Sequence, residues 1–363
     1  MNLDEQLNIA LDQVGYPPLP TKNSYKKIGS GAWHDAYLVE TVPGEPLVTR
    51  IRKKVIYGQQ EVFEHRKLWS SYAAVGLYYS QANQCYPGIC PKFYKFHIDP
   101  ALTFTVESYL GHSLLLSEYE LSQAFKYGQT LGHFFRTLHA LPQTISGFGY
   151  LVWNGETFSG TIQKPLQEIW REGTEYYLTG LERLSHSSLS FDRISVERKL
   201  QEILESRTVV SEPVSLVNQD ISPEHLIVRS KKLVSIIDPI PLLNNGTKYA
   251  GLFLGSYKFF HIANHDTPRY ASHKFIKYAP VLNAIADGFL DGYVESEMGA
   301  TKETLKERLW IEYFLWLLSF AFHLHLTLES QMSKSTLLRM GSKTAIARRL
   351  QRTIQELERF QIT

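Results

Sequence analysis

The chain has 363 residues, of which 44% are hydrophobic and 20% are charged, an ordinary globular balance that favours two domains or one large two-lobed unit. Its formal net charge of +2 argues against a nucleic-acid-binding protein, which usually has a strongly basic face. The first residues, MNLDEQLNIALDQ, include acids and no continuous apolar segment, unlike a secretory signal. The richest apolar stretch, YFLWLLSFAF at 313–322, is too short to cross a bilayer and favours a buried helix. We therefore expect a soluble cytoplasmic protein with neither a membrane nor a nucleic-acid partner.

The first third of the chain reads as a small sheet with one main helix. Residues 3–14 space their apolar side chains like one face of a helix. Three extended runs follow between residues 25 and 53, the first two of them joined through a glycine pair. Residues 59–75 have helical spacing, and CPKFYKFHI and LTFTVESYL read as two further strands joined by a short turn. Five strands and one helix are thus predicted within about the first 108 residues.

The rest of the chain is predominantly helical. A long helix is predicted after Gly111, with Ser117 as its candidate N-cap and Glu120 three residues later. Residues 143–165 are Gly-rich and look irregular, and the stretch 215–239 holds the only convincing later strands. The chain reads as helical again from about residue 273. We predict an α+β protein with a nucleotide-binding β-sheet lobe at 1–108 and a larger helical lobe at 109–363.

The glycine pair in IGSGAW allows two interpretations. The segment after Gly29, Ser30 and Gly31 alternates like a strand, so these residues lie at the tip of a hairpin rather than at the start of a helix. A glycine-rich hairpin tip can fold over phosphates and offer backbone N–H groups without a Cβ in the way. A plain hairpin turn explains the same residues equally well.

The third predicted strand, LVTRIR, is basic. Arg50 and Arg52 share one face of it, and a cation there can hold the α- and β-phosphates of a nucleotide if an acid fixes it in place. The next segment supplies Glu61 and Glu64, and we choose Glu64 as the partner of Arg50 because it stands at the start of a helix. Lys53 is a rival to Arg50 for the phosphates. These residues are also explained as surface charges, which contribute little even when paired.

Two aspartates follow apolar runs in SLVNQDISPEHLIVRSKKLVSIIDP. In phosphoryl transfer one carboxylate orients the acceptor hydroxyl and accepts its proton, and a second binds Mg²⁺, which prefers oxygen ligands. Asp220 and Asp238 fit these two roles, and His225, five residues after Asp220, can complete the metal site. The runs HLIV and LVSII between them can hold both carboxylates on one rigid hairpin. Each aspartate alone is better explained as a turn or strand-end residue.

Taken in order along the chain, these segments resemble the aminoglycoside phosphotransferase family of the protein-kinase-like superfamily. GSGAWHDAYLVE resembles its nucleotide loop, LVTRIR its third strand, LGHFFRTLHALP its long helix and GFLDGYVE a late helix. NQDISPEHLIV resembles its catalytic loop H-x-D-x-x-x-x-N, and SIIDP resembles its metal-binding motif. TVESYLGHSL resembles its hinge, which implies that Glu107, Ser108 and Tyr109 lie where the backbone meets adenine.

The resemblance implies a kinase-like two-lobed fold, ATP or GTP and Mg²⁺ as cofactors, and a small hydroxylated molecule as acceptor. It gives Asp220 the catalytic role, gives His225 and Asp238 the metal, and places Arg50, Glu64 and the glycine loop at the phosphates. The expected acceptor is an antibiotic such as an aminoglycoside or a macrolide, or a related natural product, and antibiotic resistance would be the consequence. A metabolite kinase of the choline, homoserine or sugar type and a non-catalytic nucleotide-binding scaffold are the alternatives.

Two departures from the family pattern affect the catalytic loop. Asn218 stands where the motif has histidine, a residue that mainly supports the loop, so we expect little loss. His225 stands where the motif has a metal-binding asparagine. An imidazole can ligate a divalent ion, but only when it is neutral, so activity should fall in mild acid if His225 is a ligand. Neither a DFG nor an APE segment follows Asp238, which disfavours a protein kinase.

Overall fold

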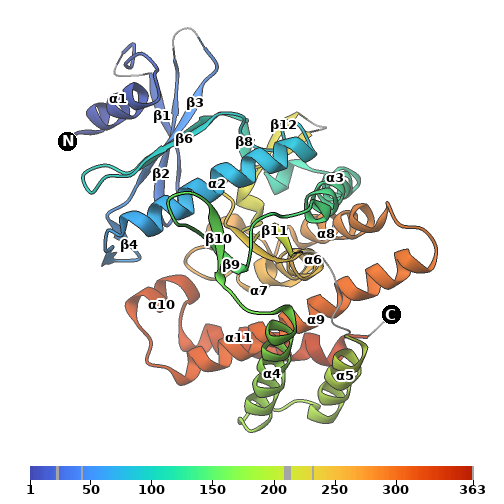
Figure 1. Cartoon of the computed structure of the whole chain (residues 1–363). Helices are drawn as coiled ribbons and strands as arrows, with labels where there is room; N and C mark the ends of the chain where they lie inside the picture. The colour runs from blue at the N-terminus through green and yellow to red at the C-terminus, as the bar shows by residue number, and fades with distance from the viewer. Residues whose placement is uncertain (22–23, 42–43, 114, 208–213, 231–232, 362–363) are drawn as a thin grey trace. The chain divides into compact units, whose positions relative to one another are not determined.

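A computed structural model of the chain describes residues 1–21, 24–41, 44–113, 115–207, 214–230 and 233–361 (Figure 1). Packing divides the chain into two compact units. The first comprises 1–114, 150–161 and 218–242, and the second comprises 115–149, 162–217 and 243–363. The first unit thus takes in most of the stretch that carries both aspartates, which we expected in the helical lobe. The predicted lobe boundary after residue 108 stays a prediction.

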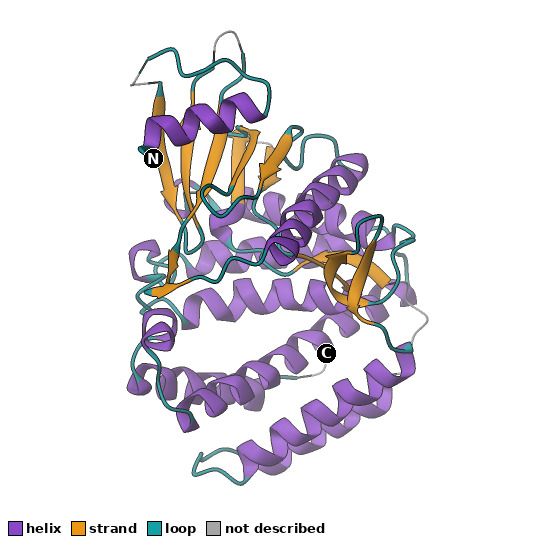
Figure 2. Ribbon diagram, turned by 60° about the vertical axis from the view of Figure 1, so that its left-hand side comes forward, coloured by secondary structure: helices purple, strands orange, loops and turns teal. Residues whose placement is uncertain are grey.

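The sheet of the first unit has five antiparallel strands, in the order β1-β2-β3-β7-β6. Its core forms where helix α1 (Leu3–Gln13) lies across one face of the sheet, burying Leu7 and Leu11 together with Tyr37 and Phe104 (Figure 2). The five predicted strands are confirmed, with the bounds β1 Tyr25–Ser30, β2 His34–Val39, β3 Leu47–Arg52, β6 Tyr94–His97 and β7 Phe104–Ser108.

The main helix of this unit, α2 (His65–Cys85), begins later and runs further than predicted. A short hairpin of β4 (Val55–Ile56) and β5 (Gln59–Gln60) occupies the segment before it. The buried side chains of Leu68, Tyr72, Tyr79 and Ala82 recur at helical spacing beyond residue 75, which explains the extra turns. Gly88, with φ of 85°, then lies in the left-handed region just beyond the helix end.

Two hairpins complete the first unit. β12 (Leu226–Ser230) and β13 (Leu233–Ile236) pair antiparallel, as predicted, and β8 (His112–Ser113) pairs with β12. β9 (Phe148–Trp153) and β10 (Phe158–Ile162) are neighbouring strands in a region that was predicted to be irregular. That prediction is wrong because Gly149 and Gly160 lie within the two strands, and the buried residues of β9, Phe148 and Leu151, are not spaced at every second position. β11 (Val214–Asn218) and β14 (Pro241–Asn245) flank the predicted catalytic-loop segment in the chain.

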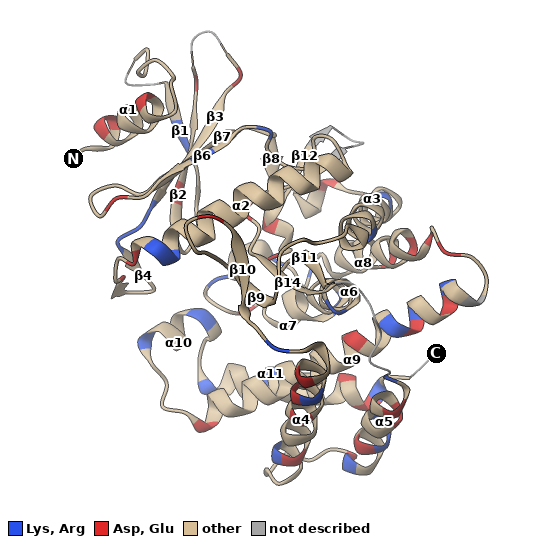
Figure 3. Cartoon of the chain, viewed as in Figure 1, with Lys and Arg blue, Asp and Glu red and all other residues tan. Residues whose placement is uncertain are grey.

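The second unit is mostly helical. Its long helix α3 has Glu120 at the N-cap position, without a side-chain capping hydrogen bond, and the predicted N-cap Ser117 lies in a single 3₁₀ turn, η1. On α4 and α5 acidic and basic residues are interspersed (Figure 3), and pairs such as Arg171–Glu175 at 3.8 Å are solvated. The elements are η1 Leu116–Glu118, α3 Leu121–Ala140, α4 Leu166–Ser185, α5 Arg193–Ser206, α6 Gly246–Gly255, η3 Ser256–Phe260, α7 His261–Ala263, η4 Ala271–His273, α8 Ala279–Val294, α9 Ala300–Glu329, α10 Lys334–Met340 and α11 Lys343–Arg359.

Helices α3 and α8 approach each other closely because glycines line the contact. A Cβ built on Gly128 would lie 2.0 Å from the carbonyl oxygen of Ile285, and one built on Gly288 would lie 1.9 Å from that of Phe125. Real Cβ atoms do not approach backbone so closely, so only glycine allows this spacing. Each helix repeats the glycine after four residues, at Gly132 and Gly292. The glycines in the sequences of α3 and α8 therefore allow these two helices to pack closely against each other.

Helix α9 contains the apolar stretch 313–322 and extends well beyond it. By length and composition alone, Thr301–Glu329 could cross a membrane, and 56% of its apolar window is buried inside the protein. It packs against α4, α6 and α11. The burial agrees with the expected core helix, although the helix is longer than the apolar run indicates.

Candidate functional site

The glycine pair lies at the tip of the β1–β2 hairpin, as predicted. The Gly31 N–H donates to the His34 carbonyl oxygen at 2.9 Å, and Gly29 pairs with Ala36. A Cβ on either glycine would meet nothing closer than 3.7 Å, so the hairpin itself does not require glycine. The missing side chains leave this backbone open to a ligand. Lys53 contacts the hairpin tip, because its Nζ donates a hydrogen bond to the Gly31 carbonyl oxygen at 2.7 Å.

Arg50, on β3, lies between two carboxylates. Because Val48 is paired with Glu107 across the strands, Arg50 and Glu107 share one face of the sheet, and Arg50 Nε donates to Glu107 Oε1 at 2.8 Å. Its Nη1 lies 3.5 Å from Asp238 Oδ2. Burial alone would lower the pKa of Arg50, but Glu107 and Asp238 raise it, so the guanidinium stays charged. The structure therefore places Arg50, rather than Lys53, against the predicted metal-binding aspartate.

The predicted pairing of Arg50 with Glu64 is wrong. Glu64 is the N-cap residue of α2, its side chain is 56% exposed, and its carboxylate pairs with Lys67 at 3.2 Å. The acid against Arg50 is Glu107, whose side chain is almost fully buried. Glu61 instead pairs with the other basic residue of the strand, Arg52, with Nε and Oε2 2.9 Å apart.

Asp238 has an unusual backbone conformation. Its φ of 52° lies in the left-handed region that non-glycine residues rarely adopt, and Pro239 follows it. Tyr79, from α2, fixes this conformation: the Asp238 N–H donates to the Tyr79 hydroxyl at 3.0 Å, and that hydroxyl donates to Glu107 Oε2 at 3.3 Å. Strain of this kind is kept at sites where the surrounding structure holds it in place. The carboxylate of Asp238 remains 43% exposed and accessible to a ligand.

Asn218 supports the loop that carries Asp220. Its buried Oδ1 accepts the N–H of Asp220 at 3.0 Å and the N–H of Ile240 at 2.9 Å, which ties the two ends of the predicted catalytic segment together. Asn218 thus supports the loop at the position where the motif has histidine. Asp220 itself keeps 29% of its side chain exposed.

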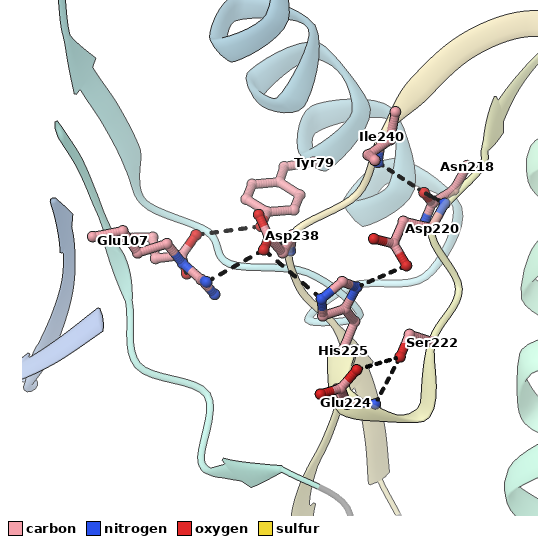
Figure 4. Close-up of polar contacts among 10 residues, drawn as sticks. Tyr79, Glu107, Asn218, Asp220, Ser222, Glu224, His225, Asp238 and Ile240 are labelled. Atoms are coloured by element: carbon pink, nitrogen blue, oxygen red, sulfur yellow. Dashed lines mark hydrogen bonds and ion pairs between the residues drawn. The ribbon is translucent and has the colours of Figure 1, made fainter. Parts of the chain in front are cut away.

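The imidazole of His225 lies between the two aspartates (Figure 4). Its Nδ1 is 3.4 Å from Asp220 Oδ1, and its Nε2 is 3.8 Å from Asp238 Oδ2. Burial alone would lower the pKa of His225, but the carboxylates of Asp220 and Asp238 raise it to about 9. The two predicted aspartates therefore lie on either side of one cationic ring at neutral pH.

A magnesium ion fits part of this arrangement. The exposed carboxylate of Asp238 offers the oxygen that Mg²⁺ prefers, and such ions take most other ligands from phosphates and water. His225 has a nitrogen beside that carboxylate, but it must lose a proton before it can ligate. Within the described ranges, no three His, Cys, Asp or Glu residues are grouped closely enough to hold a metal by themselves.

The predicted hinge residues use their backbone donors within the sheet. The N–H of Ser108 donates to the Phe93 carbonyl oxygen at 3.0 Å, and that of Tyr109 donates to the Pro46 carbonyl oxygen at 3.2 Å. These two N–H groups are therefore occupied, and an adenine at this edge would have to use carbonyl oxygens or the next residues. Glu107 is directed instead at Arg50, a role that sequence reasoning missed.

Two further residues near the site were not predicted. Tyr79 links Glu107 to Asp238, and only its place on the buried face of α2 could have indicated it. His34, at the start of β2, makes a 2.6 Å hydrogen bond between its Nε2 and the Tyr72 hydroxyl. Burial lowers the pKa of His34 to about 4, against the opposing charge of Asp238, so this imidazole is neutral.

No protein-family model matches the sequence, and no curated protein matches it either. Solved structures do match over nearly the whole chain. The macrolide 2′-phosphotransferase MphH from Brachybacterium faecium is 13% identical with a TM-score of 0.51, and 93% of this chain aligns with 98% of it. A putative fructosamine-3-kinase from Thermobifida fusca is 12% identical with a TM-score of 0.51, covering 98% of this chain and all of its own. At these identities the likeness shows the fold, and it confirms the predicted kinase-like α+β class.

Proposed function

We propose that this chain, which has the fold of small-molecule kinases, transfers the γ-phosphate of ATP or GTP to a hydroxyl of a small molecule. One observation carries the proposal: Asp220 and Asp238 flank a single imidazole, and Arg50 contacts Asp238 from the other side. Phosphoryl transfer asks mainly for positioning and charge stabilisation, which such an alternation of charges provides.

Each residue then has a defined task. Asp220 accepts a hydrogen bond from the acceptor hydroxyl and takes its proton late in the reaction. Arg50, held by Glu107, binds the nucleotide phosphates beneath the Gly29–Gly31 loop. Asp238 would hold Mg²⁺, which supplies neutralisation of the phosphate charge. His225 offsets the repulsion between the two aspartates while it is protonated, and would join the metal only as a neutral ring.

We favour a hydroxyl of an aminoglycoside-like or macrolide-like antibiotic or of a related natural product, which would make the protein a resistance or self-protection enzyme. The names of the two structural neighbours, a macrolide phosphotransferase and a putative fructosamine kinase, support small-molecule acceptors of this kind. A metabolite kinase of the choline, homoserine or sugar type uses the same machinery.

A non-catalytic nucleotide-binding protein is the second candidate. The observation that favours it is that both ring nitrogens of His225 face carboxylate oxygens, at 3.4 Å from Asp220 and 3.8 Å from Asp238, rather than an open metal position. Titration of Mg²⁺-ATP and Mg²⁺-GTP into a thermal melt separates it from a protein that binds no nucleotide. Ligand at 100-fold over Kd stabilises a protein by about 2.7 kcal/mol.

The test of the proposal is a screen of hydroxylated antibiotics and metabolites, read by release of ADP or GDP and by mass of the product. We expect acceptor-dependent release, lost in Asp220→Asn. Asp99→Asn is the matched control, because Asp99 caps an exposed turn through a 2.8 Å bond to the Ala101 N–H. Nucleotide binding without transfer to any acceptor would favour the non-catalytic candidate.

A further inference from the structure

Gln219, the residue directly before Asp220, is held in place but exposed to solvent. Its N–H donates to the Ile240 carbonyl oxygen at 3.0 Å, and its neighbour Asn218 is almost fully buried. Its side chain turns outward and its Oε1 accepts the hydroxyl of Tyr150 at 2.7 Å. The carboxamide oxygen is thus engaged, and what this side chain can offer a ligand is its NH₂ group.

Tyr150 is presented by a well-anchored strand. Three residues further along β9, the Trp153 N–H donates to the Ser70 Oγ at 3.0 Å, and the Trp153 carbonyl accepts from Arg66 at 3.4 Å. The indole also lies against Trp69, with ring centroids 5.0 Å apart. These contacts fix the hairpin to α2, so the position of Tyr150 does not depend on its own burial.

The ring of Tyr150 is 54% exposed although its hydroxyl is fixed. A core tyrosine usually buries its ring, and a surface tyrosine usually leaves its hydroxyl in water. Tyr150 differs from both, because its ring is exposed while its hydroxyl is hydrogen-bonded to the protein. It presents a flat apolar face next to a neutral amide donor, one residue from Asp220.

We propose that Tyr150 and Gln219 bind the acceptor beside Asp220 and select a saturated ring that carries several hydroxyls. This inference rests on the proposed function. The C–H face of such a ring packs on the tyrosine, one ring hydroxyl accepts from the Gln219 amide, and a neighbouring hydroxyl reaches Asp220. An acyclic amino alcohol would leave the amide unpaired and most of the aromatic face uncovered.

The experiment measures transfer from Mg²⁺-ATP or Mg²⁺-GTP to two groups of probes. The ring group is methyl glucoside, methyl riboside and erythromycin, and the acyclic group is choline, ethanolamine and homoserine. Tyr150→Phe removes only the hydroxyl, and Gln219→Ala removes the amide. Tyr25→Phe is the control, because it deletes a tyrosine hydroxyl with the same 2.7 Å length, bonded to Asp4 Oδ1.

We expect transfer to ring acceptors, with their KM raised roughly three- to tenfold in Tyr150→Phe and Gln219→Ala, the loss of about one neutral hydrogen bond. kcat should change little in these variants, whereas a purely structural role would lower kcat through Asp220. Tyr25→Phe should match the parent protein.

Transfer to the acyclic group alone overturns the inference and leaves the proposed function standing. Ring transfer with an unchanged KM in both variants, or with a fall in kcat alone, also overturns it. If phosphate is transferred to neither group of probes, both the inference and the proposed function are contradicted. Stabilisation of the protein by Mg²⁺-nucleotide then shows whether it still binds the nucleotide.

Discussion

The predicted catalytic loop of the first unit and the α3–α8 contact of the second each enclose a histidine, and the pKa values of the two rings shift in opposite directions. Burial lowers the pKa of His139 to about 3, and its Nδ1 shares a 3.0 Å hydrogen bond with the Tyr293 hydroxyl. His225 is also shielded from solvent, but Asp220 and Asp238 raise its pKa to about 9. Burial therefore sets the charge of a histidine only where no carboxylate opposes it.

The same contrast extends to the surroundings of each ring. Along the α3–α8 contact, which includes His139 and Tyr293, the helices are brought together by the absence of side chains at Gly128 and Gly288. Around His225 the strands and loop are held by alternating charges whose carboxylates stay partly open to solvent. Changes at the α3–α8 contact should therefore cost stability, whereas changes to the open carboxylates should cost activity first.

The largest effect on stability is expected at Glu107, the most buried carboxylate of the charged cluster. Glu107→Ala would leave Arg50 buried beside Asp238 alone, and breaking a buried pair in this way costs about 3–5 kcal/mol. Urea unfolding measures the change, with Glu61→Ala as control, because the Arg52–Glu61 pair is more exposed and should cost less than about 1 kcal/mol. Equal losses in the two variants would contradict the special place given to Glu107.

The glycine contact gives the next largest effect. Gly288→Ala would place a Cβ 1.9 Å from the Phe125 carbonyl oxygen, so the helices must separate, at a cost of about 3 kcal/mol. Gly173→Ala, in the middle of α4, meets nothing within 4 Å and should stabilise the protein by about 0.5–1 kcal/mol through helix propensity. Thermal unfolding of both variants decides the point, and a harmless Gly288→Ala would show that the close approach is not needed.

The two histidines should give opposite pH dependences. The folded pKa of His139 lies below its unfolded value, so the unfolded state binds the extra proton and stability is lost as pH falls below about 6.5, by up to about 1.4 kcal/mol per pH unit. The folded pKa of His225 lies above its unfolded value, so its contribution is complete below about pH 6.5 and is lost as pH rises towards 9. Urea unfolding from pH 5 to 9, compared with His139→Asn and His225→Asn, isolates each slope. Slopes of the same sign would refute the comparison.

The smallest effect concerns the backbone of Asp238. A glycine adopts a φ of 52° without the strain that a Cβ causes, so Asp238→Gly should be about 1 kcal/mol more stable than Asp238→Ala. Both variants lose the carboxylate equally, which cancels its contact with Arg50. If the two variants unfold at the same urea concentration, the left-handed conformation stores no strain.

Much of the fold could be predicted from sequence patterns within single short segments. The hairpin at Gly29–Gly31 and the strands between Asp220 and Asp238 alternate clearly, and both were predicted. The β9–β10 hairpin was missed because each strand contains a glycine and the buried residues of β9 do not alternate. The pairing of Gly128 with the α8 backbone depends on two helices far apart in sequence, which one sequence cannot bring together.

The site was predicted in its residue types but not in all its partners. Asp220, His225 and Asp238 share one segment, so their closeness follows from local spacing. The partner of Arg50 depends on strand register: placing Glu107 diagonally across from it requires knowing that β3 pairs with β7. The choice of Glu64 rested on chain proximity, and tertiary pairing decided otherwise.

Turnover of Asp220→Asn tests the central claim most directly. With an acceptor from the screen, kcat should fall roughly 10²- to 10⁴-fold, because the general base is lost, while Mg²⁺-nucleotide still raises the melting temperature as in the parent protein. Unchanged turnover in Asp220→Asn, with the nucleotide bound as before, would contradict the assignment of Asp220 and the phosphotransfer mechanism built on it.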